Sequence, residues 1–248
     1  MAFLEMHYFS NSLQKATAAN VILPELDHPG PFPVFYLLHG LSDDNSNWQR
    51  RTSIERYVEN LPLIVVMPDG GRGWYCDAQQ GYAYESAIVN DLVSFMDSRF
   101  NTIASREGRC LGGLSMGGYG AIKLALAHAD MFCSTTSHSG ALDWVHRLIT
   151  EESDWAIEFR KILGESPVGG PNDTFALAEK ICRDMLPAIR IDCGVDDFLI
   201  EENRSFHAHL DKLKIPHEYK EFPGDHNWGY WDEHVQEAIA FHSRQLGI

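Results

Sequence analysis

The most informative stretch of this chain reads Arg109-Cys110-Leu111-Gly112-Gly113-Leu114-Ser115-Met116-Gly117-Gly118-Tyr119-Gly120-Ala121. Its centre has the pattern Gly-x-Ser-x-Gly, with an extended segment before Ser115 and a small-residue helix predicted over residues 121–127. This order is typical of a nucleophile elbow, a tight strand-to-helix turn that holds a serine hydroxyl clear of the backbone. Glycines at positions 113 and 117 permit the close backbone approach that such a turn needs.

The five-residue pattern is weak evidence by itself, because glycine and serine are common residues. The strand before it and the glycine-rich helix start after it favour the elbow, and free N–H groups at that helix start suit a developing oxyanion. The alternative is a glycine-rich turn that only packs or binds phosphate. A phosphate-binding loop would end in Gly-Lys-Ser or Gly-Lys-Thr, and the sequence contains neither.

The composition predicts one folded unit. The 248 residues, 44% hydrophobic and 22% charged, suffice for one core, so we expect a single α/β domain over residues 1–248. Twenty basic and 35 acidic residues give a net charge of −15, which disfavours nucleic acid and anionic membranes as partners. Five cysteines without a C-x-x-C pair favour reduced, buried thiols. Without a signal peptide or a long apolar run, we expect a cytoplasmic protein, and a homo-oligomer stays open.

Strands alternate with helices along the chain, which predicts a mostly parallel sheet with helices on both faces. Besides the segment before Ser115, strands are expected at residues 3–10, 16–23, 34–38, 63–67, 132–139, 189–194 and 217–222. The first two of these should pair antiparallel. Helices are expected at residues 53–60, 84–100, 121–127, 201–213 and 231–245. Loops are expected at residues 27–31 and from residue 42 to Trp48, and residues 142–186 indicate a helical insertion over the sheet.

A nucleophilic serine needs a base and an acid, and in a parallel sheet such groups gather at the carboxyl ends of strands. In α/β-hydrolases the chain order is serine, acid, histidine. Asp196 and Asp197 follow the strand at 189–194, and His226 follows the last strand. His226 would accept the proton of Ser115, and one of the two aspartates would orient the imidazole. These residues alone do not choose between the aspartates, and Asp192 is expected to be a packed polar group within its strand.

The remaining histidines have simpler interpretations. His207 and His209 are expected to be solvated on a helix, and His138 and His234 to be structural. The chain has no His-x-x-x-His pattern and no paired Cys/His spacing, so we expect neither a metal nor a cofactor.

Two backbone N–H groups should form an oxyanion hole. One is that of Met116, directly after the nucleophile, and the other is that of Leu41, in the turn after the strand at 34–38. A turn that merely ends the strand is the simpler interpretation of His39-Gly40. Aromatic residues that could line a pocket, each equally suited to the core, are Trp48, Trp74, Tyr75, Trp228 and Trp231.

Four motifs together resemble the esterase D-like "putative esterase" family over residues 8–241. They are Leu37-Leu38-His39-Gly40-Leu41, the elbow from Gly112 to Gly118, Cys193-Gly194-Val195-Asp196-Asp197-Phe198-Leu199 and Gly224-Asp225-His226-Asn227-Trp228. The family includes tributyrin esterases, S-formylglutathione hydrolases, feruloyl and acetyl-xylan esterases and mycolyltransferases. Tributyrin-esterase-like carboxylesterases are the most similar, since they also begin with a segment like Ser12 to Pro24.

The resemblance implies an α/β-hydrolase fold and assigns the acid to Asp197, which stands three residues after the strand-ending glycine. It implies a cofactor-free serine carboxylesterase that forms an acyl-enzyme on Ser115 and acts on small esters. Short acyl groups are the expected substrates, because no large lid domain is evident in the sequence. Thioester hydrolysis of the S-formylglutathione type, feruloyl or acetyl-xylan ester hydrolysis, and acyl transfer to an alcohol are alternatives. A non-catalytic binding module is a further one, although such relics usually lose the nucleophile or the base.

Overall fold

The computed structural model describes residues 1–25, 29–147 and 152–248. These residues contain one eight-stranded sheet with the strand order β1-β2-β4-β3-β5-β6-β7-β8. The strands are β1 (Ala2–Ser10), β2 (Lys15–Leu23), β3 (Val34–Leu38), β4 (Ile64–Pro68), β5 (Arg109–Leu114), β6 (Ser134–His138), β7 (Ala188–Gly194) and β8 (Glu218–Phe222). β1 and β2 form the expected antiparallel hairpin, β2 pairs antiparallel with β4, and all the other neighbours are parallel.

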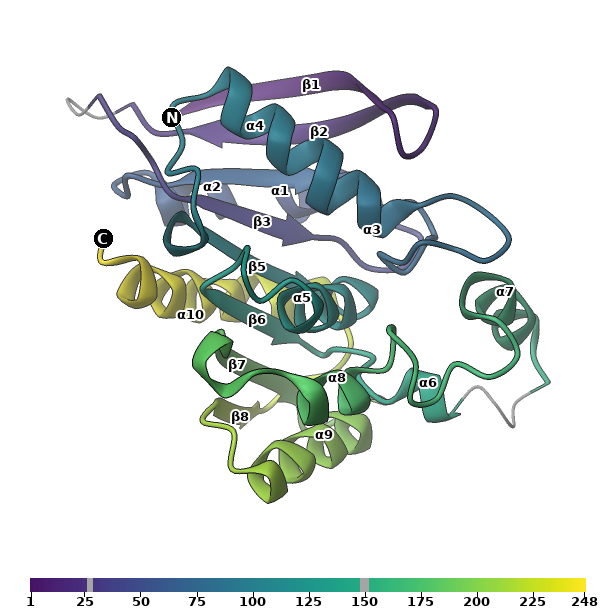
Figure 1. Cartoon of the computed structure of the whole chain (residues 1–248). Coiled ribbons are helices and arrows are strands. Elements are labelled where there is room, and N and C mark those ends of the chain that lie inside the picture. Colours follow the sequence, from purple (N-terminus) through teal and green to yellow (C-terminus); the bar gives the residue numbers. More distant parts are fainter. Residues whose placement is uncertain (26–28, 148–151) are drawn as a thin grey trace.

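Helices cover both faces of the sheet, which is why every residue of β3, β4 and β5 is buried. The helices are α1 (Asn47–Arg51), α2 (Ile54–Val58), α3 (Tyr84–Ser86), α4 (Val93–Arg99), α5 (Met116–Ala127), α6 (Trp144–Arg147), α7 (Asp154–Leu163), α8 (Thr174–Lys180), α9 (Ile200–Leu213) and α10 (Trp228–Leu246). A π-helical turn (Ala87–Leu92) joins α3 to α4, and short 3-10 helices lie at Arg106–Gly108 and Arg183–Met185. In Figure 1, α4, α5 and α9 lie in front of the sheet, and α1, α2 and α10 lie behind it.

The structure confirms the expected fold class, a mostly parallel sheet between two layers of helices. Three local expectations were wrong. Helix α1 occupies Asn47–Arg51, which includes part of the expected polar loop. Helix α5 begins at Met116, directly behind Ser115 where a helix start was expected, so it is longer than the helix expected over residues 121–127. Helix α10 begins at Trp228, because the side-chain oxygen of Asn227 accepts the backbone N–H of Tyr230 and caps it.

The segment expected as an insertion contains α6, α7, α8 and the 3-10 helix at Arg183–Met185. Figure 1 shows α6 and α7 beyond the ends toward which the parallel strands point, while α8 lies close to the sheet. α8 packs against α5 and α9, and the buried side chain of Asp173 caps its start. Residues 148–151 of this segment and residues 27–28 of the expected loop at 27–31 lie outside the described residues.

All five cysteines are free, and Cys76, Cys110 and Cys193 are buried as expected. The expectation was wrong for Cys182, which is exposed, and for Cys133, which is half-buried. No helix in the described ranges has the length and apolar character needed to cross a membrane.

Candidate active site

Ser115 occupies a strained turn between β5 and α5. Its backbone has φ 52° and ψ −116°, a conformation that non-glycine residues rarely adopt. The turn is crowded on both sides, since a Cβ atom on Gly117 would lie 2.4 Å from the carbonyl oxygen of Leu38. A Cβ atom on Gly113 would lie 2.5 Å from the backbone of Gly117. These glycines therefore let three backbone segments meet beneath the serine hydroxyl.

Three side chains from separate loops form one hydrogen-bonded row. The Nε2 atom of His226 lies 3.1 Å from the Oγ atom of Ser115. The Nδ1 atom of His226 lies 2.9 Å and 3.0 Å from the two carboxylate oxygens of Asp197. Because an ionised carboxylate only accepts hydrogen bonds, Nδ1 carries the proton and Nε2 presents its lone pair to the serine hydroxyl.

The acid of this row is Asp197, because the turn after β7 points its side chain inward. Asp197 is 2% exposed, and its Oδ1 atom also accepts the backbone N–H of Leu199 at 2.8 Å. Asp196 is exposed, and its backbone N–H donates to the carbonyl of Gly224. Asp192 is buried within β7 and accepts hydrogen bonds from His138 and from the hydroxyl of Tyr230.

Aromatic neighbours hold the ring of His226. The ring of Phe198 lies 4.5 Å from it, and the ring of Trp231 stands perpendicular to it at 4.9 Å. The indole N–H of Trp231 donates to the hydroxyl of Ser139 at the end of β6. These contacts fix the orientation that the two hydrogen bonds of the imidazole require.

Two backbone N–H groups come from residues close to Ser115, since Met116 follows it in the chain and Leu41 lines the same cavity. Those of Leu41 and Met116 have no hydrogen-bond partner within the described parts of the chain. The turn that carries Leu41 is held by the buried ring of His39, whose Nδ1–H donates to the carbonyl of Gly40 at 2.7 Å. Its Nε2 atom accepts the backbone N–H of Gly70 at 2.8 Å, which joins the turn after β3 to the loop after β4. The arrangement leaves both N–H groups free for an oxyanion.

A cavity of about 340 Å³ opens at the serine. Residues from several loops and from helices α6 and α7 line it: Leu41, Trp74, Ser115, Ala141, Trp144, Arg147, Trp155, Phe198, Leu199 and His226. A larger and more open hollow of about 750 Å³ is lined by residues such as Arg106, Cys133 and Gln245, and none of its lining residues belongs to the row. The smaller cavity is therefore the one that chemistry at Ser115 can use.

Of the aromatic residues expected around the pocket, Trp74 lines the cavity. Trp48 and Tyr75 are buried in the core, where their polar atoms donate to the carbonyls of Leu38 and His39. Trp228 is half-buried and packs edge-on against Trp48 and Trp231. Contrary to expectation, the residues that line the cavity do not include Trp48, Tyr75, Trp228 or Trp231.

The sequence analysis did not single out Trp144, Arg147, Trp155 or Phe198, all of which line the cavity. Only their positions in the sequence could have suggested them as pocket residues, since three of them lie in the insertion and Phe198 directly follows Asp197. Arg147 donates to the carboxylate of Glu202 at 3.0 Å. Burial of Glu202 raises the pKa of its carboxyl to about 7, although Arg147 and the backbone N–H of Asp143 oppose the shift.

The other histidines mostly have structural partners. His138 is buried against Asp192, and His234 stacks on Phe222 at 4.2 Å, as expected for structural residues. The expectation that His207 and His209 are solvated was wrong, because both rings are half-buried. The ring of His209 packs beside Phe175, and that of His207 stacks on Tyr219.

Comparisons with known proteins agree on the family. Residues 10–242 match the family model described as "Putative esterase". The acetyl esterase of Caldicellulosiruptor saccharolyticus is 29% identical over an alignment 265 positions long, gaps included. The alignment covers 98% of this chain and 99% of that protein. Fluorophosphonate-binding serine hydrolase F of Staphylococcus aureus, solved with substrate bound, is 30% identical with a TM-score of 0.90. That match covers 97% of this chain and 98% of the other.

Two further solved structures are similar over almost the whole chain. The S-formylglutathione hydrolase of Staphylococcus aureus is 30% identical, with a TM-score of 0.86 over 97% of this chain and 98% of that one. A ferulic acid esterase is 26% identical, with a TM-score of 0.83 over 99% of this chain and 98% of that one. These neighbours confirm the α/β-hydrolase fold expected from the sequence, and they differ among themselves in substrate.

Proposed function

Because the chain belongs to the "Putative esterase" family and is a serine hydrolase that acts on esters, we propose that it is a carboxylesterase for short-chain esters. The observation that carries the proposal is the 3.1 Å contact between Ser115 and His226 at the floor of a 340 Å³ cavity. A small ester is the partner that such a cavity can receive.

The first half of the proposed reaction forms an acyl-enzyme. The Oγ atom of Ser115 attacks the ester carbonyl while Nε2 of His226 takes its proton, and Asp197 stabilises the resulting imidazolium. The backbone N–H groups of Leu41 and Met116 bind the oxyanion of the tetrahedral intermediate, and each such donor typically contributes about 10²–10³ in turnover. The bond to the leaving alcohol then breaks, and the alkoxide takes the proton from His226.

The second half returns the enzyme to its starting state. Water attacks the acyl carbonyl while His226 takes one of its protons, and the same two N–H groups bind the second oxyanion. Collapse of this intermediate breaks the bond to Ser115, which regains its proton from His226, and the carboxylic acid leaves. Besides the ester and water, the proposed reaction uses only side chains and backbone N–H groups of this chain.

The preference for short acyl groups rests on the size and lining of the cavity. Trp74 and Phe198 bound it, and the segment at residues 142–186 adds Trp144, Arg147 and Trp155 to the wall. A series of p-nitrophenyl esters from acetate to decanoate tests the preference. We expect kcat/KM to be highest for acetate to butyrate and at least tenfold lower for octanoate. A maximum at octanoate or beyond would contradict it.

Hydrolysis of S-formylglutathione is the second candidate, because a hydrolase of that thioester is 30% identical and matches over 97% of this chain. The guanidinium of Arg147, which is paired with Glu202, also lies at the cavity wall, where it can contact a carboxylate of the glutathione leaving group. Comparing kcat/KM for S-formylglutathione and p-nitrophenyl butyrate separates the two. A panel with feruloyl and acetylated-xylan esters tests the remaining alternatives in the same assay.

A further inference from the structure

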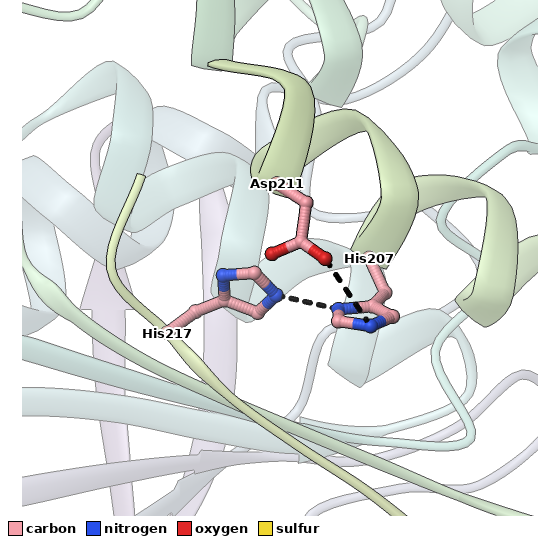
Figure 2. Close-up of side chains that lie close together, drawn as sticks. All are labelled: His207, Asp211 and His217. Atoms are coloured by element: carbon pink, nitrogen blue, oxygen red, sulfur yellow. Dashed lines mark hydrogen bonds and ion pairs between the residues drawn. The ribbon is translucent and has the colours of Figure 1, made fainter. Parts of the chain in front are cut away.

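A second group of chemically active side chains lies away from the esterase site. Figure 2 shows His207 and Asp211 on α9 facing His217, which lies in the connection to β8. Each residue offers one possible ligand atom, and these three atoms all lie within 4.8 Å of one another. We propose that these three side chains form a binding site for a divalent transition-metal ion, with Zn²⁺ as its representative.

His217 is already oriented as a metal ligand. Its Nδ1 atom lies 2.8 Å from the backbone carbonyl of Ile215, and a carbonyl only accepts, so Nδ1 carries the proton. The lone pair therefore sits on Nε2, which faces His207. Metal-binding histidines typically donate their second N–H to a carbonyl or a carboxylate in this way, which fixes the tautomer.

His207 supplies a second nitrogen from a ring that is also held in place. Its ring stacks on Tyr219 at 4.2 Å with an angle of 7° between the planes. Its Nδ1 atom lies 2.7 Å from Nε2 of His217, so in the metal-free protein the two nitrogens share one proton. A tetrahedral Zn²⁺ ion with bonds of about 2.0–2.1 Å separates two such nitrogens by about 3.3 Å. A parting of the rings by roughly 0.6 Å makes room for the ion. The proton on Nδ1 of His207 then moves to Nε2 of the same ring, which leaves Nδ1 with a lone pair for the ion.

Asp211 completes the set from the same face of α9, four residues after His207. Its Oδ2 atom lies 3.6 Å from Nε2 of His207, and its exposed carboxylate is free to turn toward the ion or to hold that N–H. Two imidazoles and one carboxylate suit zinc and its neighbours, whereas Ca²⁺ and Mg²⁺ prefer oxygen ligands alone. The nearby Arg204 is paired with Glu201 and Glu221, so its charge is compensated.

The site would connect the end of α9 to the start of β8. Part of this site is visible in the sequence, because a histidine and an aspartate lie four residues apart on a predicted helix. The pattern His-x-x-x-His does not include such a pair. Because the ion would bind the folded chain through residues from two segments, it should stabilise the fold. The row at Ser115 contains none of these residues, so esterase activity should not depend on the ion.

Calorimetric titration of EDTA-treated protein with ZnCl₂ tests the proposal. We expect one zinc per chain with a dissociation constant in the micromolar range, weakened at least tenfold by His207→Gln and by His217→Gln. The matched control is His209→Gln, which lies on the same helix but whose ring packs beside Phe175, and it should bind zinc as the wild type does. Unchanged p-nitrophenyl acetate hydrolysis in each variant shows that it is folded.

Thermal unfolding and Co²⁺ absorption provide independent readouts. Zinc should raise the melting temperature of the wild type and of His209→Gln, but not that of His217→Gln. Co²⁺ bound at the site should show visible bands that both His207→Gln and His217→Gln lose. Absence of zinc binding up to millimolar concentration would overturn the proposal, as would equal affinity in the wild type and the two histidine variants.

Discussion

The Oγ atom of Ser115 and the Nε2 atom of His226 lie 3.1 Å apart, although 111 residues separate them in the chain. Ser115 follows β5, whereas His226 follows β8, three strands away at the edge of the sheet. At the usual spacing of neighbouring strands this is a span of about 14 Å. The loop after β8 must therefore run back across the end of β7, and the glycines at 194 and 224 are where it does so.

The first prediction concerns that crossing. A Cβ atom on Gly194 would lie 2.3 Å from the carbonyl oxygen of Gly224, so Gly194→Ala should push the loop and shift His226. A displacement of about 1 Å can cost roughly 10² in rate. We expect kcat for p-nitrophenyl acetate to fall by about that factor. Gly169→Ala is the control for backbone strain: its φ of +74° makes an alanine there cost stability, but no atom lies within 4 Å of its Cβ position, so kcat should stay at the wild-type value. Wild-type kcat in Gly194→Ala would contradict the account.

The second prediction separates the two neighbouring aspartates. Asp197→Asn should lower kcat by about 10³–10⁴, because an amide no longer favours the tautomer with its proton on Nδ1 of His226. Asp196→Asn, one residue away and exposed, should leave kcat within a factor of two. Steady-state kinetics of both variants measure this. Equal losses in the two would remove Asp197 from its assigned role.

The third prediction concerns the cavity wall. Trp144→Ala should enlarge the space beside Trp74, whose ring centre lies 4.7 Å from that of Trp144. We expect the kcat/KM maximum of the p-nitrophenyl ester series to move toward longer acyl chains by two or more carbons. Tyr82→Ala, which removes an exposed aromatic ring outside this cavity, is the control. An unchanged chain-length profile would place the acyl group elsewhere.

The fourth prediction concerns pH and stability. Burial raises the pKa of Glu202 from 4.5 to about 7, so the folded state holds a proton that the unfolded chain releases between these values. This stabilisation is complete below about pH 4.5 and is lost as the pH rises through 7. Chemical denaturation at pH 5 and pH 8 should show that the free energy of unfolding of the wild type falls by up to about 2.5 kcal/mol more than that of Glu202→Gln. The control Glu201→Gln changes an exposed neighbour and should lose as much stability between the two pH values as the wild type. An equal loss in Glu202→Gln would contradict the prediction.

Much of the fold was predictable because its signals are local. The buried run at Val34–Leu38 and the glycine pattern around Ser115 each specify their own backbone. The order serine, acid, histidine along the chain depends only on which loops follow which strands. Parallel strands bring those loops to one edge of the sheet.

The pocket was less predictable because its wall depends on how distant segments pack. Trp48 and Trp74 are both aromatic residues near strand ends, yet the first is buried by α10 and the second faces the cavity. Arg147 reaches the cavity from the insertion, a segment in which no strand periodicity sets direction. Composition and spacing do not say which face such residues turn toward, so these contacts required the structure.

The central claim, that His226 activates Ser115 as a nucleophile, is tested most directly by mapping where a fluorophosphonate probe reacts. Mass spectrometry of digested, labelled protein should show one phosphonyl group, on the peptide that contains Ser115. Ser115→Ala should stay unlabelled, and His226→Ala should react at least 10³-fold more slowly while still folded. A probe adduct on another residue, or full labelling of Ser115→Ala, would contradict the account.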